Sequence, residues 1–153
     1  SPAAKVVLSF IEAVNEQDWS RLRELVMPSF RRHSRAGGDI EGIESLIGFL
    51  QSEFTSFPDA KEVCTHYFTD GNMVTAIMEF SGTQRGSLGD FKPSGIYVSA
   101  PYIAVYRIEG DRIAESWAEW DNLSTLKSLG HKNEKSRTMS LTQRATRAGH
   151  DER

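Results

Sequence analysis

A change of hydrophobic period near residue 60 constrains the fold of this chain more than any other feature. Before it, apolar residues recur at the spacing of amphipathic helices, and after it they alternate as in half-buried strands. Helices are expected over residues 3–16, from an N-cap at Asp18 to Pro28, and over 43–54. Longer strands are expected over residues 61–68, 73–83, 97–108 and 112–122, with a short strand at 30–34 and a last helix at 123–129. Helices followed by a four-stranded antiparallel meander predict an α+β fold, in which helices cover one face of a curved sheet and leave a concavity for a small molecule.

Composition narrows the class of protein. The chain has 153 residues and a net charge of −3, and its body carries no basic stripe of the kind that binds nucleic acid. No apolar run reaches membrane-spanning length. A lone cysteine, Cys64, excludes an internal disulfide and favours a reducing compartment. Because the start also lacks a signal-peptide core, a cytoplasmic protein is predicted.

Domain organisation is predicted from the same pattern. Residues 1–130 form one α+β domain, and residues 131–153 form a polar tail with six Lys or Arg and three acidic residues.

Three carboxylates near the end of the last strand are the first candidate for chemistry. If that strand is regular, Glu115, Trp117, Glu119 and Asp121 share one face, because side chains repeat every second residue. Carboxylates beside an indole predict either a solvated outer face or the wall of a pocket in which the acid groups transfer protons.

Asp121 is the predicted catalytic acid or base, with Glu119 as its neighbour. A dry site would raise the pKa of Asp121 towards neutral, and a second carboxylate would raise it further. Asp121→Asn is then predicted to lower turnover at least ~100-fold. The alternative is that Asp121 is the N-cap of the 123–129 helix and that Glu119 lies on a solvated strand edge.

Two histidines are further candidates for catalysis or metal binding. His33 is predicted to polarise a substrate carbonyl or carry a proton, although a single histidine is also a common structural residue. His66 and Cys64 alternate on one strand face, but two ligands without a third make a poor zinc site, so no metal is predicted.

The predicted substrate-binding residues are aromatic or apolar side chains on strands and one loop, together with His66. The set is Trp117, Phe57, His66, Met78, Phe80 and Tyr102. Each could instead be ordinary core, whereas together they would suit a flat polyaromatic or terpenoid ligand.

Four segments resemble one family. They are Phe10-Ile11-Glu12-Ala13-Val14-Asn15, then Phe57-Pro58-Asp59, then Phe80-Ser81-Gly82-Thr83, and the run 106–117 closed by Trp120-Asp121-Asn122-Leu123. In this order, across about residues 6–130, the chain resembles the SnoaL-like polyketide cyclases of the nuclear transport factor 2-like superfamily.

The resemblance implies a cone-shaped α+β barrel with a deep pocket, related to cystatin-like barrels, and a homodimer without cofactor. Family members close a polyketide ring by an intramolecular aldol reaction. Asp121 matches the acid/base carboxylate of the family, and His33 matches its early-strand histidine. Ser116 and Gln84 depart from the pattern, because relatives often carry histidine at both positions.

The predicted function is therefore a cofactor-independent cyclase or isomerase of a hydrophobic polyketide- or terpenoid-like compound. Two alternatives stay open. One is epoxide opening or hydrolysis, with Glu119 and Asp121 as the acid pair. The other is a binding protein without chemistry.

Overall fold

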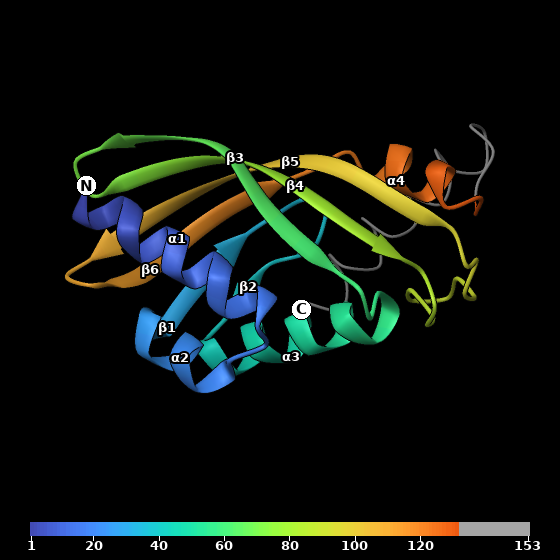
Figure 1. Ribbon diagram of the computed structural model, residues 1–153. Coiled ribbons are helices and arrows are strands. Elements are labelled where there is room, and N and C mark those ends of the chain that lie inside the picture. The colour runs from blue at the N-terminus through green and yellow to red at the C-terminus, as the bar shows by residue number, and fades with distance from the viewer. Residues whose placement is uncertain (132–153) are drawn as a thin grey trace.

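The computed structural model describes residues 1–131 as four helices and six strands (Figure 1). The helices are α1 (Pro2–Asn15), α2 (Trp19–Leu25), α3 (Ile43–Ser56) and α4 (Asn122–Ser128). The strands are β1 (Val26–His33), β2 (Ile40–Glu41), β3 (Lys61–Asp70), β4 (Met73–Thr83), β5 (Tyr97–Glu109) and β6 (Arg112–Glu119). Apart from His131, the predicted polar tail lies outside the described residues.

All six strands form one curved sheet in the order β2-β1-β6-β5-β4-β3. The three helices that precede β3 lie along one side of this sheet, as predicted (Figure 1). The meander β3 to β6 is antiparallel, which confirms the predicted four strands. The mixed α+β class is therefore confirmed.

The first strand was only partly predicted. β1 begins directly after α2 and runs parallel to β6, and β2 was missed. Pro28 and Ser29 are exposed within β1, and its register against β6 shifts between Val26 and Arg31. An irregular strand that contains proline lacks the clean alternation from which strands are predicted.

Local sequence signals mark two of the helix ends, although α2 ends at Leu25 and does not continue to Pro28. The Asp18 carboxylate accepts a hydrogen bond from the Arg21 backbone N–H at 3.1 Å, so the predicted N-cap is confirmed. Gly130 follows α4 with a φ of +81°, a conformation that favours glycine just past a helix end.

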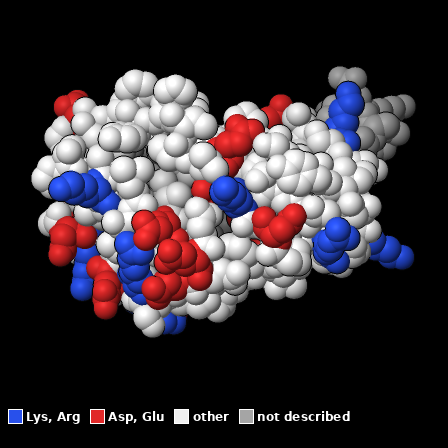
Figure 2. Space-filling model, in the orientation of Figure 1, with Lys and Arg blue, Asp and Glu red and all other residues white. Residues whose placement is uncertain are grey.

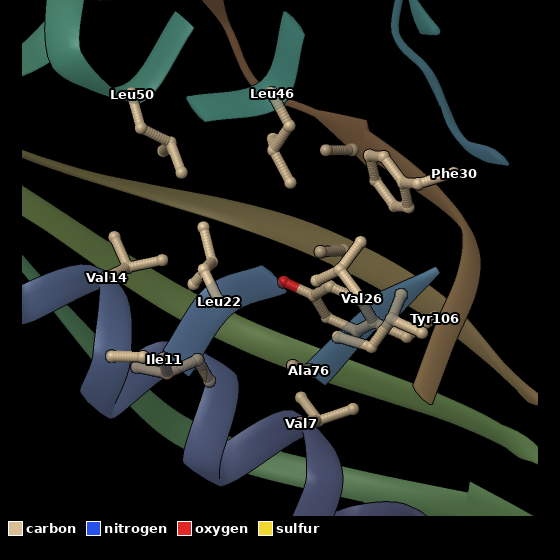
Figure 3. Packing of buried hydrophobic residues seen from close by; sticks show 14 of the residues in the cluster. Val7, Ile11, Val14, Leu22, Val26, Phe30, Leu46, Leu50, Ala76 and Tyr106 are labelled. Atoms are coloured by element: carbon tan, nitrogen blue, oxygen red, sulfur yellow. The ribbon is translucent and has the colours of Figure 1, made fainter. Parts of the chain in front are cut away.

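The main core lies between the helices and the inner face of the sheet (Figure 3). Val7, Ile11 and Val14 of α1 pack with Leu22 and with side chains of α3 and β5. A second, smaller cluster forms around Phe57, Val98 and Leu129.

Acidic and basic residues are interspersed on the face seen in Figure 2, without a continuous basic stripe among the described residues. Within residues 1–131, no helix is both long and apolar enough to cross a membrane.

Candidate active site

Glu62 and Tyr102 lie on the inner face of the sheet. Glu62 pairs with Phe80 across β3 and β4, and Tyr102 pairs with Met78, which is buried in the core. The Tyr102 hydroxyl donates a hydrogen bond to Glu62 Oε2 at 2.7 Å. A carboxyl and a phenol are thus held together against the helices.

The backbone of Glu62 is fixed by the last residue of α1. Asn15 Nδ2 donates to the Glu62 carbonyl at 2.8 Å, and Asn15 Oδ1 accepts from the Glu62 N–H at 2.8 Å. This pair of bonds ties α1 to β3 at the residue that carries the buried carboxyl. The position of the acid is therefore set by rigid elements, as a catalytic group requires.

Glu53 of α3 faces the same interior. Burial of its carboxyl raises the pKa of Glu53 to about 7, although Arg32 opposes the shift. Burial, with repulsion from Glu53, raises the pKa of Glu62 to about 8, although the Tyr102 hydrogen bond opposes it. We call Glu53 and Glu62 the interior acid pair. Near neutral pH, Glu62 keeps its proton while Glu53 is about half ionised. The first can therefore act as an acid and the second as a base.

The interior acid pair makes stability depend on pH. Both carboxyls have an ordinary pKa of 4.5, and folding raises it. The pair therefore stabilises the fold fully below about pH 4.5, and this contribution is lost as pH rises through about 7 and 8. We expect the free energy of unfolding in urea to fall over that window and the fall to be smaller in Glu62→Gln. A flat wild-type profile would contradict the placement of these acids.

Asp121 does not face a dry interior, so that expectation is wrong. It is exposed and caps α4, and its Oδ1 accepts from the Ser124 N–H at 2.9 Å. β6 ends at Glu119, before Asp121, so the alternation that placed Asp121 on a pocket wall does not reach it. The capping alternative is the observed one.

Glu119 and Asp121 both line an open surface depression of about 260 Å³. Glu119 Oε1 accepts hydrogen bonds from Ser34 Oγ and from the Arg35 and Ala36 backbone N–H groups. This carboxylate stabilises the turn after β1. To act with Asp121 as the acid pair for epoxide opening, Glu119 would have to break these hydrogen bonds.

His33 lies on the outer face of the sheet. It stacks on Trp117 with ring centroids 5.3 Å apart, and its Nε2 lies 2.5 Å from Glu115 Oε2. The hydrogen bond from His33, assisted by Arg107, lowers the pKa of Glu115. Ser116 and Ala118 point inward instead, so Glu115, Trp117 and Glu119 share the solvated face. The structure does not bring His33 together with the interior acid pair.

The predicted binding residues divide between the two faces. Met78 and Phe57 are buried, and Phe80 packs on Phe57 with ring centroids 5.2 Å apart. Tyr102 contacts the interior acid pair, as described, whereas Trp117 is on the outer face. His66 is exposed, because the register of β3 shifts between Cys64 and His66 and turns them to opposite faces. The two side chains were wrongly expected to share a face.

Glu53, Glu62 and Arg32 were missed by sequence reasoning, although each breaks a local pattern. Glu53 is three residues after Leu50 and four before Phe57, which is the position of an apolar residue on a buried helix stripe. Arg32 follows Phe30 at the two-residue spacing of an inward strand face. A charge at a core position is the signal that could have found them. Within the described residues, no three His, Cys, Asp or Glu side chains are grouped to hold a metal.

Helices packed on a curved sheet that carries ionisable groups on its inner face define an α+β protein of the nuclear transport factor 2-like fold. Residues 4–129 match the model of the SnoaL-like polyketide cyclases, so the chain belongs to that family. Membership supports a cyclase or isomerase type of function. No protein with a curated description matches the chain.

Solved structures agree with this assignment. TsrD from Streptomyces laurentii is 26% identical with a TM-score of 0.76, and the match covers 86% of this chain and 96% of that one. IdmH from Streptomyces antibioticus, a candidate polyketide cyclase, is 25% identical with a TM-score of 0.76, over 84% and 98% of the two chains. A candidate SnoaL-like cyclase from Jannaschia sp. CCS1, at 22% identity and a TM-score of 0.78, covers 86% and 94% and shows the shared fold.

Proposed function

We propose that this protein is a cofactor-independent cyclase or isomerase of a hydrophobic, polyketide- or terpenoid-like carbonyl compound, and that the interior acid pair transfers the protons. The hydrogen-bonded Glu62 and Tyr102, on the inner face near Glu53, are the observation that carries the proposal. Raised carboxyl pKa values close to neutral suit general acid–base catalysis. Family membership makes ring closure the first reaction to test.

The chemistry needs one base and one acid. Ionised Glu53 would take a proton from the carbon next to a carbonyl, while protonated Glu62 gives its proton to the carbonyl oxygen, so an enol forms. In a cyclase, the enol carbon then attacks a second carbonyl carbon of the same molecule and forms a carbon–carbon bond, while Glu62 takes back the enol O–H proton and Glu53 gives its proton to the second carbonyl oxygen. In an isomerase, Glu62 takes back the enol O–H proton while Glu53 gives its proton to another carbon conjugated with the enol. Each route returns both carboxyls to their first protonation states.

Proton abstraction can be tested without the natural substrate. 2-Tetralone in D₂O exchanges the hydrogens next to its carbonyl for deuterium, and NMR follows that exchange. Faster exchange with wild-type protein, its loss in Glu53→Gln and Glu62→Gln, and its retention in Asp121→Asn form the expected pattern. Exchange that is equal in all four proteins would reject the interior acid pair.

A homodimer through the outer face of the sheet is part of the proposal. Phe68 of β3 and Ile103 of β5 are 62% and 53% exposed, and Val63 and Trp117 are exposed on the same face. Apolar side chains on one sheet face favour burial against a second copy by two-fold symmetry.

Ile103→Arg is expected to convert the dimer into a monomer, because a charge would then lie among the exposed apolar side chains that the dimer would bury. Light scattering after gel filtration should give twice the chain mass of 17.2 kDa for wild type and the single mass for the variant. Leu8→Arg is the matched control, since Leu8 is 38% exposed on α1, away from that face. A monomeric wild type would overturn this part of the proposal.

A further inference from the structure

Arg32 is a buried cation without a carboxylate partner. Only 7% of its surface is exposed, and no acidic side chain of residues 1–131 lies within 4.0 Å of its guanidinium. The neighbouring Arg31 points outward and lies 3.5 Å from Glu41. A buried charge is costly unless it is paired, so Arg32 needs an explanation that Arg31 does not.

The contacts of Arg32 hold it in place but give its guanidinium no direct ion pair within the described residues. Its guanidinium lies 4.3 Å from the centre of the Phe49 ring and 5.8 Å from that of Trp120. Nη2 donates to the Gly38 carbonyl at 2.9 Å, whereas the buried Nε has no hydrogen-bond partner within the described chain. Aromatic faces and one carbonyl stabilise a cation only in part.

Trp120 is held close to this guanidinium by the turn after β1. A Cβ at Gly37 would overlap the Trp120 ring and approach Arg32 Nη2 to 2.8 Å. Trp120 also contacts Tyr102, with ring centroids 6.4 Å apart. The tryptophan therefore links Arg32 to the phenol that donates to Glu62, so Arg32 and the interior acid pair belong to one region.

Among residues 1–131, none of the titratable groups around Arg32 lies within 4.0 Å of its guanidinium as an ion-pair partner. Glu53 of α3, Asp39 of the turn, and Tyr102 and Tyr106 of β5 all face it. Burial raises the pKa of both tyrosines above their ordinary values, so they are neutral. Glu53 is largely protonated below its pKa of about 7, and Asp39 Oδ1 accepts from the Ser34 N–H at 3.0 Å.

We propose that Arg32 binds an anionic oxygen of the ligand, and that the interior takes a flat hydrophobic carboxylic acid. The proposal rests on the proposed function, because the carboxylic acid that Arg32 binds would be the substrate on which the interior acid pair acts. Arginine matches the planar geometry of a carboxylate, and Phe49 and Trp120, which pack against the guanidinium, hold it in position. Arg32 is thus a binding and specificity residue, and it neither donates nor accepts the transferred proton.

The test compares two probes of the same shape by titration calorimetry at pH 6. 2-Naphthoate carries a carboxylate, and 2-naphthamide is its uncharged analogue. Wild type is expected to bind 2-naphthoate about tenfold more tightly or better, as a charge-assisted hydrogen bond gives. Arg32→Gln should lose that preference and keep its affinity for 2-naphthamide. Arg31→Gln, the matched control, should bind both probes as wild type does.

If Arg32→Gln fails to fold, the affinities of wild type for the two probes still test the proposal. Equal affinity of wild type for both probes, or no binding of either at millimolar concentration, overturns the proposal. So does an Arg32→Gln protein that retains the preference. Arg32→Lys should keep part of it, because the charge remains while the planar fork is lost. Ligand binding does not need turnover, so the two proposals can fail separately. If wild type prefers 2-naphthoate but Glu62→Gln exchanges the hydrogens of 2-tetralone as fast as wild type, only the proposed function is rejected.

Discussion

Glu62→Gln is expected to lower the rate of α-hydrogen exchange in 2-tetralone at least ~100-fold at pH 7.5, the usual scale for losing a general acid or base. Glutamine keeps the size of the side chain and can still accept the Tyr102 hydrogen bond, but it cannot give a proton to the developing oxyanion. Glu53→Gln is expected to have an effect of similar size, because the base is removed. NMR of the probe in D₂O measures both.

The pH profile separates the two roles. Exchange in wild type should rise as Glu53 ionises near pH 7 and fall as Glu62 loses its proton near pH 8. Residual activity in Glu53→Gln should lose the acid limb, and that in Glu62→Gln the alkaline limb. A damaged fold would lower the rate without removing one limb selectively.

Asp121→Asn decides between the interior acid pair and the carboxylate predicted from the sequence. Asparagine is as good an N-cap as aspartate, so α4 should persist and only the charge is lost. We expect turnover close to wild type, in contrast to the ~100-fold loss predicted from the sequence. A large loss in Asp121→Asn with normal Glu62→Gln would return the catalytic role to Asp121.

The fold was predictable because its signals are local. The β4 strand was predicted at its observed ends, Met73 and Thr83, and the Asp18 cap was also predicted. Alternation, capping and turn residues each act within a few positions. The pairing of β1 with β6 joins residues 84 to 87 positions apart in the chain, and no local pattern specifies it.

The site was less predictable, because strand alternation gives two faces and does not say which one is inner. Trp117 and its acidic neighbours do share a face, as predicted, but Ser116 and Ala118 occupy the inner one. Placing three carboxylates inward would have required partners for each of them. The interior acids instead come one from α3 and one from β3. Only the folded arrangement brings Glu53 close enough to raise the pKa of Glu62.

Gly86→Ala is expected to destabilise the protein by about 3 kcal/mol, at the upper end of overpacking effects. An added Cβ would overlap the Thr55 carbonyl oxygen and lie 3.1 Å from the Thr55 carbonyl carbon, and both are backbone atoms that cannot rotate away. The Gly86 N–H also donates to the Ser56 carbonyl at 3.1 Å, and Ser56 Oγ donates to the Ser87 carbonyl at 2.7 Å. Relieving the overlap would pull the loop off the end of α3 and break these bonds. Urea unfolding measures the loss.

Gly48→Ala is the matched control, and the opposite sign is expected. Gly48 lies within α3, and a Cβ there meets no atom within 4 Å. Alanine should therefore stabilise the protein by about 1 kcal/mol through helix propensity alone. The two substitutions are expected to differ in sign because the new methyl group overlaps backbone at Gly86 and meets no atom on the helix at Gly48. If Gly86→Ala were also neutral or stabilising, the loop would not be held against α3, and the end of the interior next to Phe57 would be free to open.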